Sequence, residues 1–89
     1  MTWRVEFLPA SAKEFAALDG AVQKRIGKFL SERLALLDDP RSLGEALRGP
    51  KLGAFWKYRV GDWRVIASIE DQTVRIMIVR IGNRRAVYR

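Results

Sequence analysis

The sequence predicts a single α+β domain, in which a helical hairpin packs on one face of a sheet made of an N-terminal strand and a three-stranded antiparallel meander. Two observations predict this fold. Apolar residues recur at helical spacing between residues 15 and 37, whereas four other segments have the composition typical of strands. The 89 residues, 48% of them hydrophobic, suffice for one modest core, so the domain is expected to span residues 1–89.

The first forty residues supply the N-terminal strand and both helices. Trp3–Leu8 alternates apolar and polar residues, as a strand with one buried face does, and a proline ends it. Ser11 and Glu14 have the spacing of a capping box, which predicts a short helix that runs to about Leu18. An Asp-Gly pair then separates this helix from a longer one over Ala21–Leu37, which another proline stops.

The remaining residues are expected to form a loop, a meander and a tail. Residues 41–53 are rich in glycine and proline, which is typical of a loop. A Gly-Asp pair at Gly61 predicts a two-residue primed hairpin turn, whereas the next turn has a weaker signal and is expected to hold a bulge or a longer loop. Three strands are expected on either side of these turns, over Ala54–Val60, Trp63–Glu70 and Thr73–Ile81.

The chain contains no cysteine and no histidine. The lack of cysteine excludes disulfides, a thiol nucleophile and a cysteine-based zinc site. The lack of histidine removes the usual general base and the commonest metal ligand. Any chemistry must therefore use lysine, arginine, tyrosine, hydroxyl or carboxylate groups. No apolar segment is long enough to span a bilayer, which predicts a cytoplasmic protein without a membrane partner.

The net charge of +7 comes entirely from residues 41–89, which hold eleven Lys/Arg against four acids, whereas residues 1–40 are balanced. Basic side chains spaced along expected strands predict a polyanionic partner. The alternative is a solvated basic surface that serves only solubility.

The hairpin turn predicts which basic side chains meet. A two-residue turn places Arg59 opposite Arg64, and strand alternation puts Lys57 on the same face as Arg59. Like charges that face each other across a hairpin repel, and no acid in either strand offsets them. The cluster therefore predicts an anion-binding face, and removing an arginine such as Arg64 or Arg84 is expected to leave the stability unchanged or slightly higher. The alternative is that the long side chains spread into water.

Other polar and aromatic residues are expected to have structural roles. Tyr58 and the three tryptophans should pack in or beside the core, with stacking on a nucleobase as the alternative for Trp56. Four glutamates show no metal-ligand spacing and are expected to be surface or capping groups: Glu6, Glu14, Glu45 and Glu70. The tail after the last strand is expected near Arg64, where Arg84 offers a guanidinium to phosphate and Tyr88 a ring or a hydroxyl.

Three segments together resemble the RelE/ParE superfamily of toxins from type II toxin–antitoxin systems: Leu47–Gly49, Trp56–Val65 and Ile81–Tyr88. The resemblance covers the whole chain and implies the RelE-like, microbial ribonuclease-like fold. The RelE branch consists of ribosome-dependent endoribonucleases that need no metal or cofactor and leave a 2′,3′-cyclic phosphate. The ParE branch poisons DNA gyrase instead, and a non-catalytic RNA-binding module is a third alternative.

The resemblance also implies site residues and partners. The catalytic set of the RelE branch falls on Lys57, Arg59, Arg64, Arg84 and Tyr88, and further RNA contacts are expected from Arg48, Lys51, Arg85 and Arg89. The expected partners are a small acidic, RelB-like antitoxin, the ribosome and mRNA.

Two departures from the RelE pattern bear on the general base. Arg59 stands where RelE has lysine, and an arginine is never deprotonated in a protein. Asn83 stands where many relatives have histidine. The proton-accepting role therefore falls to Lys57 or Tyr88, or the reaction depends on electrostatic stabilisation alone. Of the two side chains, Lys57 is preferred because it is expected on a strand within the cluster.

Overall fold

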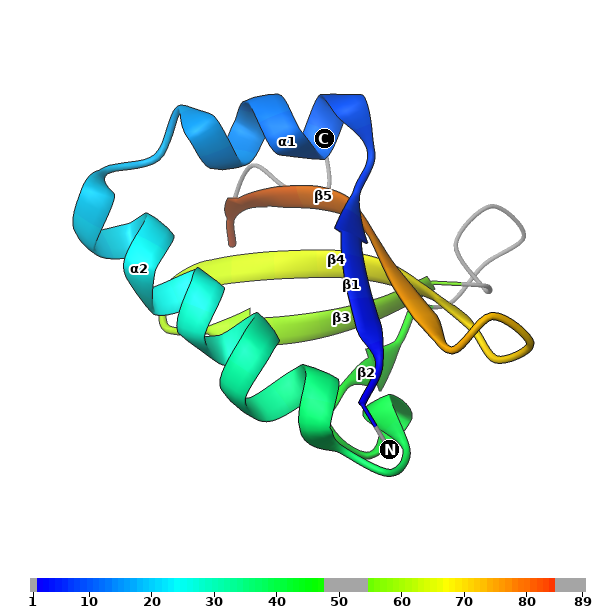
Figure 1. Cartoon of the computed structure of the whole chain (residues 1–89). Helices are drawn as coiled ribbons and strands as arrows, with labels where there is room; N and C mark the ends of the chain where they lie inside the picture. The colour runs from blue at the N-terminus through cyan, green and yellow to red at the C-terminus, as the bar shows by residue number, and fades with distance from the viewer. Residues whose placement is uncertain (1, 48–54, 85–89) are drawn as a thin grey trace.

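The protein is seen in a computed structural model that describes residues 2–47 and 55–84. A five-stranded sheet with the order β1-β5-β4-β3-β2 is covered by two helices (Figure 1). The strands are β1 (Arg4–Phe7), β2 (Glu45–Ala46), β3 (Phe55–Val60), β4 (Trp63–Glu70) and β5 (Arg75–Asn83). The α+β fold class is therefore confirmed.

The meander of β3, β4 and β5 is antiparallel as predicted. The sequence did not predict how the N-terminal strand pairs, and the structure shows that β1 lies parallel to β5. At the other edge the structure differs from the prediction, because β2, a two-residue strand inside the segment predicted to be loop, pairs antiparallel with β3. β5 begins two residues later than predicted because the turn after β4 runs through Val74, so the longer loop expected there is confirmed.

The helical region covers nearly the predicted residues, but its hydrogen-bonding pattern changes from α-helical to π-helical and then to 3-10 along the chain. Two α-helices are followed by a π-helical turn and two short 3-10 segments: α1 (Pro9–Ala16), α2 (Gly20–Lys28), η1 (Phe29–Arg33), η2 (Leu34–Leu36) and η3 (Pro40–Leu43). The predicted second helix over Ala21–Leu37 thus corresponds to α2, η1 and η2 together. Apolar side chains on this stretch are buried against the sheet, among them Ile26, Leu30 and Leu34.

The predicted capping box at the start of α1 is wrong. Pro9 begins the helix three residues earlier than expected, because its fixed φ suits the first helical position. Ser11 therefore lies inside the helix, where its buried Oγ donates to the carbonyl oxygens of Leu8 at 3.0 Å and Ile78 at 2.6 Å. The carboxylate of Glu14 accepts from the Ile81 amide at 3.0 Å instead of reaching back along the helix. These bonds fix α1 on β5.

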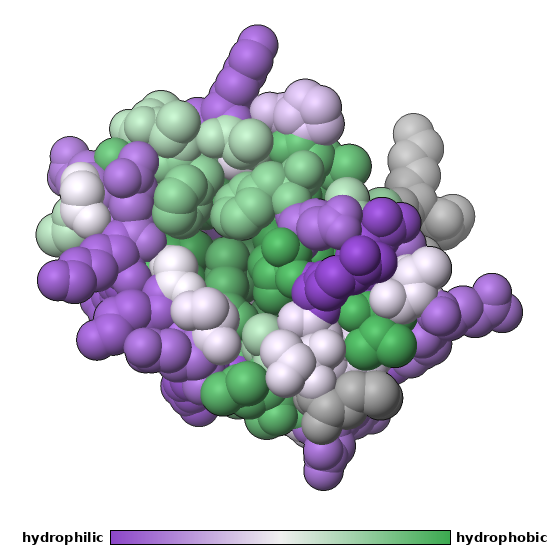
Figure 2. Space-filling model, viewed as in Figure 1, coloured by the Kyte–Doolittle hydropathy of each residue, from purple (hydrophilic) through white to green (hydrophobic). Residues whose placement is uncertain are grey.

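The core lies between α2 and the sheet face that carries Tyr58, Val65 and Ile78, all fully buried. Tyr58 and Val65 were predicted to face this core, as was Trp3, which is 6% exposed. Apolar side chains also gather between the helices and β1 on the face seen in Figure 2, where a groove of about 410 Å³ opens. No helix within residues 2–47 and 55–84 is long and apolar enough to cross a membrane.

Candidate active site

The β3–β4 hairpin sets the geometry of the basic face, as the sequence predicts. Gly61 has a φ of 62°, a value that favours glycine, and Val60 pairs with Trp63 across a two-residue turn. This register places Arg59 opposite Arg64. Strand alternation puts Lys57 on the same face of the sheet, opposite the side that packs on α2.

Arg64 is held in place by the hairpin turn. Its Nη1 donates to the carbonyl oxygens of Gly61 at 2.8 Å and Trp63 at 2.9 Å, and the residue is only 9% exposed. Because part-buried bonds from a guanidinium to backbone carbonyls contribute stability, this geometry favours a loss of stability when Arg64 is removed, over the unchanged or higher stability expected from charge repulsion alone. The turn instead fixes the position of one cation before any anion arrives.

Glu45 is the residue of this face that the sequence reasoning missed. It lies on β2 opposite Lys57, and its Oε2 is 3.1 Å from Lys57 Nζ. The expectation that no acid in the hairpin strands offsets the cluster holds for β3 and the start of β4, but the unpredicted strand β2 brings a carboxylate alongside. The available signal was that Glu45 is the one acid between Arg41 and Gly61.

The pKa of Glu45 reflects the positive charges of the cluster around it. The pKa of Glu45 is lowered, first because its carboxylate accepts a hydrogen bond from Lys57 and then because of the positive charge of Lys57. Arg59 and Arg64 lower this pKa further through their charges. The side chain is 63% exposed. An ionised carboxylate in reach of solvent and of three cations is therefore built into the face.

The last described residue, Arg84, lies beside the same turn. Its backbone amide donates to the Asp62 carbonyl at 3.0 Å, and Gly82 pairs with Arg64. The predicted proximity of the tail's start to Arg64 is confirmed. Five predicted site residues lie outside the described residues: Arg48, Lys51, Arg85, Tyr88 and Arg89.

Other basic residues of this half have acidic partners. Arg41 binds Asp71 through two bonds of 2.6 and 3.0 Å, Arg75 pairs with Glu70 at 2.6 Å and with Glu6 at 3.4 Å, and Arg80 pairs with Glu14 at 3.4 Å. In contrast, Arg59 and Arg64 form no ion pair with any residue in 2–47 or 55–84. Two guanidinium groups that face each other across the hairpin are thus without an ion pair to any described acid.

Tyr58 has a structural role. Its hydroxyl donates to the Pro40 carbonyl at 2.9 Å, and burial raises its pKa to about 12. Trp56 lies near the guanidinium of Arg41, 5.9 Å from the Trp56 ring centroid. Within the described ranges, no three acidic side chains gather as metal ligands would.

Comparison with known proteins assigns this fold and basic face to a class, the toxins of type II toxin–antitoxin systems. A family model described as the ParE toxin of the type II toxin–antitoxin system parDE matches residues 5–88. The chain belongs to this family, within the RelE/ParE superfamily that the sequence resembles.

Relatives and solved structures agree with this membership. An Escherichia coli protein described as a RelE-like toxin is 30% identical over 84 residues, which cover 94% of this chain and 85% of that protein. The RelE–RelB complex of Pyrococcus horikoshii superimposes with a TM-score of 0.74 at 27% identity, covering 98% of this chain and 100% of the other. A RelBE toxin–antitoxin complex of Mycobacterium tuberculosis superimposes with a TM-score of 0.84 at 20% identity, covering 93% of this chain and 92% of the other. This similarity shows the shared fold.

Proposed function

We propose that this toxin is an endoribonuclease that cleaves mRNA on the ribosome and thereby stops translation in the cytoplasm. The observation that carries the proposal is the pairing of Arg59 with Arg64 across the hairpin, with neither side chain in an ion pair with a described acid. Two guanidinium groups on facing strands suit the oxygens of a phosphodiester, because each offers a planar fork of donors.

The reaction that fits this face is an internal transesterification. The RNA 2′-oxygen attacks the adjacent phosphorus, the bond from phosphorus to the 5′-oxygen breaks, and a 2′,3′-cyclic phosphate remains. The proton of the 2′-hydroxyl must go to a base, and the leaving 5′-oxygen must receive one. Arg59, Arg64 and Arg84 would stabilise the charge on the phosphate oxygens during this displacement. Tyr88 is the candidate donor to the 5′-oxygen.

The structure adds a third candidate to the two proton acceptors that the sequence suggests. Lys57 accepts a proton only as the neutral amine, whereas its Nζ lies 3.1 Å from the carboxylate of Glu45, as expected for an ammonium group. Glu45 is an exposed carboxylate that is already ionised, so it can accept a proton without first losing one, although its lowered pKa makes it a weaker base than an ordinary glutamate. We therefore assign the base to Glu45 and the role of holding it to Lys57.

A toxin of this kind needs an inhibitor, and the similar structures from Pyrococcus horikoshii and Mycobacterium tuberculosis are complexes of toxin with antitoxin. The proposed partner of this chain is likewise a RelB-like antitoxin. It should be acidic, because the chain that it must neutralise carries a net charge of +7.

Inhibition of DNA gyrase is the second candidate function, since the matching family model is that of the ParE toxin. The two functions damage different molecules in the cell, mRNA in one case and DNA in the other. Induced expression is expected to leave mRNA cut within reading frames, with primer extension marking the cuts and a cyclic phosphate at each 3′ end. Intact mRNA together with DNA-damage signalling would instead support the gyrase inhibitor.

A further inference from the structure

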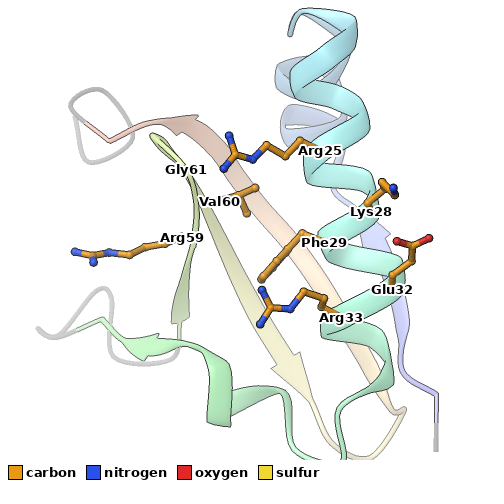
Figure 3. Close-up of a pocket in the computed structure, with 8 residues that line it drawn as sticks. All are labelled: Arg25, Lys28, Phe29, Glu32, Arg33, Arg59, Val60 and Gly61. Carbon is orange, nitrogen blue, oxygen red and sulfur yellow. The ribbon is translucent and has the colours of Figure 1, made fainter.

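A second basic feature lies on the other side of β3, between this strand and α2. A groove of about 320 Å³ is lined by α2 and η1 on one wall and by the end of β3 on the other. We call it the α2–β3 groove. In Figure 3, Arg25, Phe29 and Arg33 point from the helix toward β3, whereas the side chain of Arg59 points away from the helix.

The charges along the groove are almost all positive. Arg25, Lys28 and Arg33 line it, and none of them forms an ion pair within residues 2–47 and 55–84. The one acid in the lining, Glu32, points to the side of the helix away from β3 in Figure 3. The guanidinium of Arg33 lies 5.8 Å from the centroid of the Phe29 ring. The groove therefore combines an apolar floor with flanking guanidinium groups.

The strand that borders the groove has an unused edge. β2 pairs with β3 only at Lys57 and Trp56, and the chain before β2 turns away at Gly44, where a Cβ would come within 2.8 Å of the Tyr58 ring. Because backbone groups alternate in direction along a strand, the amide and carbonyl of Arg59 point to the same side as those of Lys57. No described strand pairs with Arg59 on that side.

We propose that the α2–β3 groove binds an extended acidic segment of the antitoxin, which adds to the sheet as a strand on the free edge at Arg59, in line with β2. This inference rests on the proposed function for the source of the segment. Backbone bonds to Arg59 would set its register, apolar side chains would cover Phe29 and Val60, and carboxylates would reach Arg25 and Arg33. An RNA strand would use the same cations but has no peptide groups to pair with this edge, so the edge favours a peptide.

Such a strand would act on the candidate active site through the hairpin. It would lie along Arg59 and end at Gly61, whose carbonyl holds Arg64. The guanidinium of Arg25 already lies against this turn, within 3.0 Å of where a Gly61 Cβ would be.

The test uses a capped peptide of about eight residues with alternating valine and glutamate, the length of a typical strand. Binding to the whole chain is followed by NMR, with hydrogen exchange at the Arg59 amide as the local readout. We expect the peptide to protect this amide. Three matched probes should bind about tenfold more weakly or not at all: the peptide with lysine for glutamate, the peptide with alternate backbone nitrogens methylated, and an oligouridylate of similar length.

Charge reversal in the groove locates the binding. Arg25→Glu and Arg33→Glu should each weaken the peptide about tenfold or more, whereas Lys24→Glu, which makes the same charge change on α2 outside the groove, should not. Equal binding by all three variants, equal binding of the methylated peptide, or binding of the oligouridylate alone would overturn the proposal. Cleavage of mRNA by the same variants separates the two proposals, since both groove variants should keep it if the nuclease assignment holds.

Discussion

Glu45 and Lys57 face each other across β2 and β3, with the carboxylate Oε2 3.1 Å from the lysine Nζ. The pair links a two-residue strand to the hairpin that carries Arg59 and Arg64. It also places a base candidate and three cations on one sheet face without a histidine.

The first prediction concerns the charge state of Glu45. Its lowered pKa means that the ion pair contributes stability above the pKa of an ordinary glutamate, and that this contribution is lost as the pH falls through the lowered value. An NMR titration of the Glu45 carboxyl carbon should show the lowered pKa, and Lys57→Met should raise it toward the ordinary range. An unchanged value in Lys57→Met would mean that the ion pair is not formed in solution.

The second prediction assigns the base. Glu45→Gln keeps the shape of the side chain but accepts no proton, so single-turnover cleavage of ribosome-bound mRNA should fall by about 10²–10⁴-fold. Lys57→Arg keeps the charge beside Glu45 and should have the smaller effect. If cleavage falls little in Glu45→Gln but strongly in Lys57→Arg, Lys57 is the base. If cleavage falls little in both variants, Tyr88 is the remaining candidate base.

The third prediction separates the two roles of Arg64. Arg64→Ala removes both bonds to the hairpin turn and should lower the free energy of unfolding by about 1–3 kcal/mol. Arg59→Ala, at an exposed position without such bonds, should leave stability within about 0.5 kcal/mol of the parent. Denaturant unfolding measures both changes. Both variants should lose cleavage, and Arg59→Ala shows the effect of the lost charge without a loss of stability. If Arg59→Ala retains cleavage, Arg59 is not part of the active site.

Most of the fold and the basic face follows from sequence because the signals are local. The Gly-Asp turn fixes the register of β3 on β4, and that register alone places Arg59 opposite Arg64. Helical spacing places Ile26, Leu30 and Leu34 in the core in the same way.

The features that sequence reasoning missed depend on contacts between distant segments. β2 has two residues, too few for any periodicity, and exists because β3 offers it an edge. The parallel pairing of β1 with β5 joins the two ends of the chain. The spacing of Ser11 and Glu14 predicts a capping box, whereas Pro9 sets where the helix begins and the Ile78 carbonyl binds the Ser11 hydroxyl.

The fourth prediction tests Tyr58 as a structural group. Tyr58→Phe loses the hydrogen bond to the Pro40 carbonyl and should cost about 1 kcal/mol of stability with cleavage unchanged. Because its pKa is raised to about 12 in the folded protein, this phenol contributes stability below its ordinary value, which is lost as the pH rises from about 10 to about 12. A titration followed by phenolate absorbance should show an increase at about pH 12 in the parent protein, and this increase should be absent in Tyr58→Phe. An increase that persists there would contradict the assignment.

The most direct test of the nuclease assignment removes one oxygen atom, that of the 2′-hydroxyl, from the substrate. Purified protein is mixed with ribosomes programmed with mRNA whose nucleotide before the cut carries a 2′-hydrogen in place of the 2′-hydroxyl, alongside the unmodified mRNA. We predict cleavage of the unmodified message to a 2′,3′-cyclic phosphate and none of the 2′-deoxy message, since the attacking oxygen is missing. Equal cleavage of both messages, or cleavage of neither, would contradict the account.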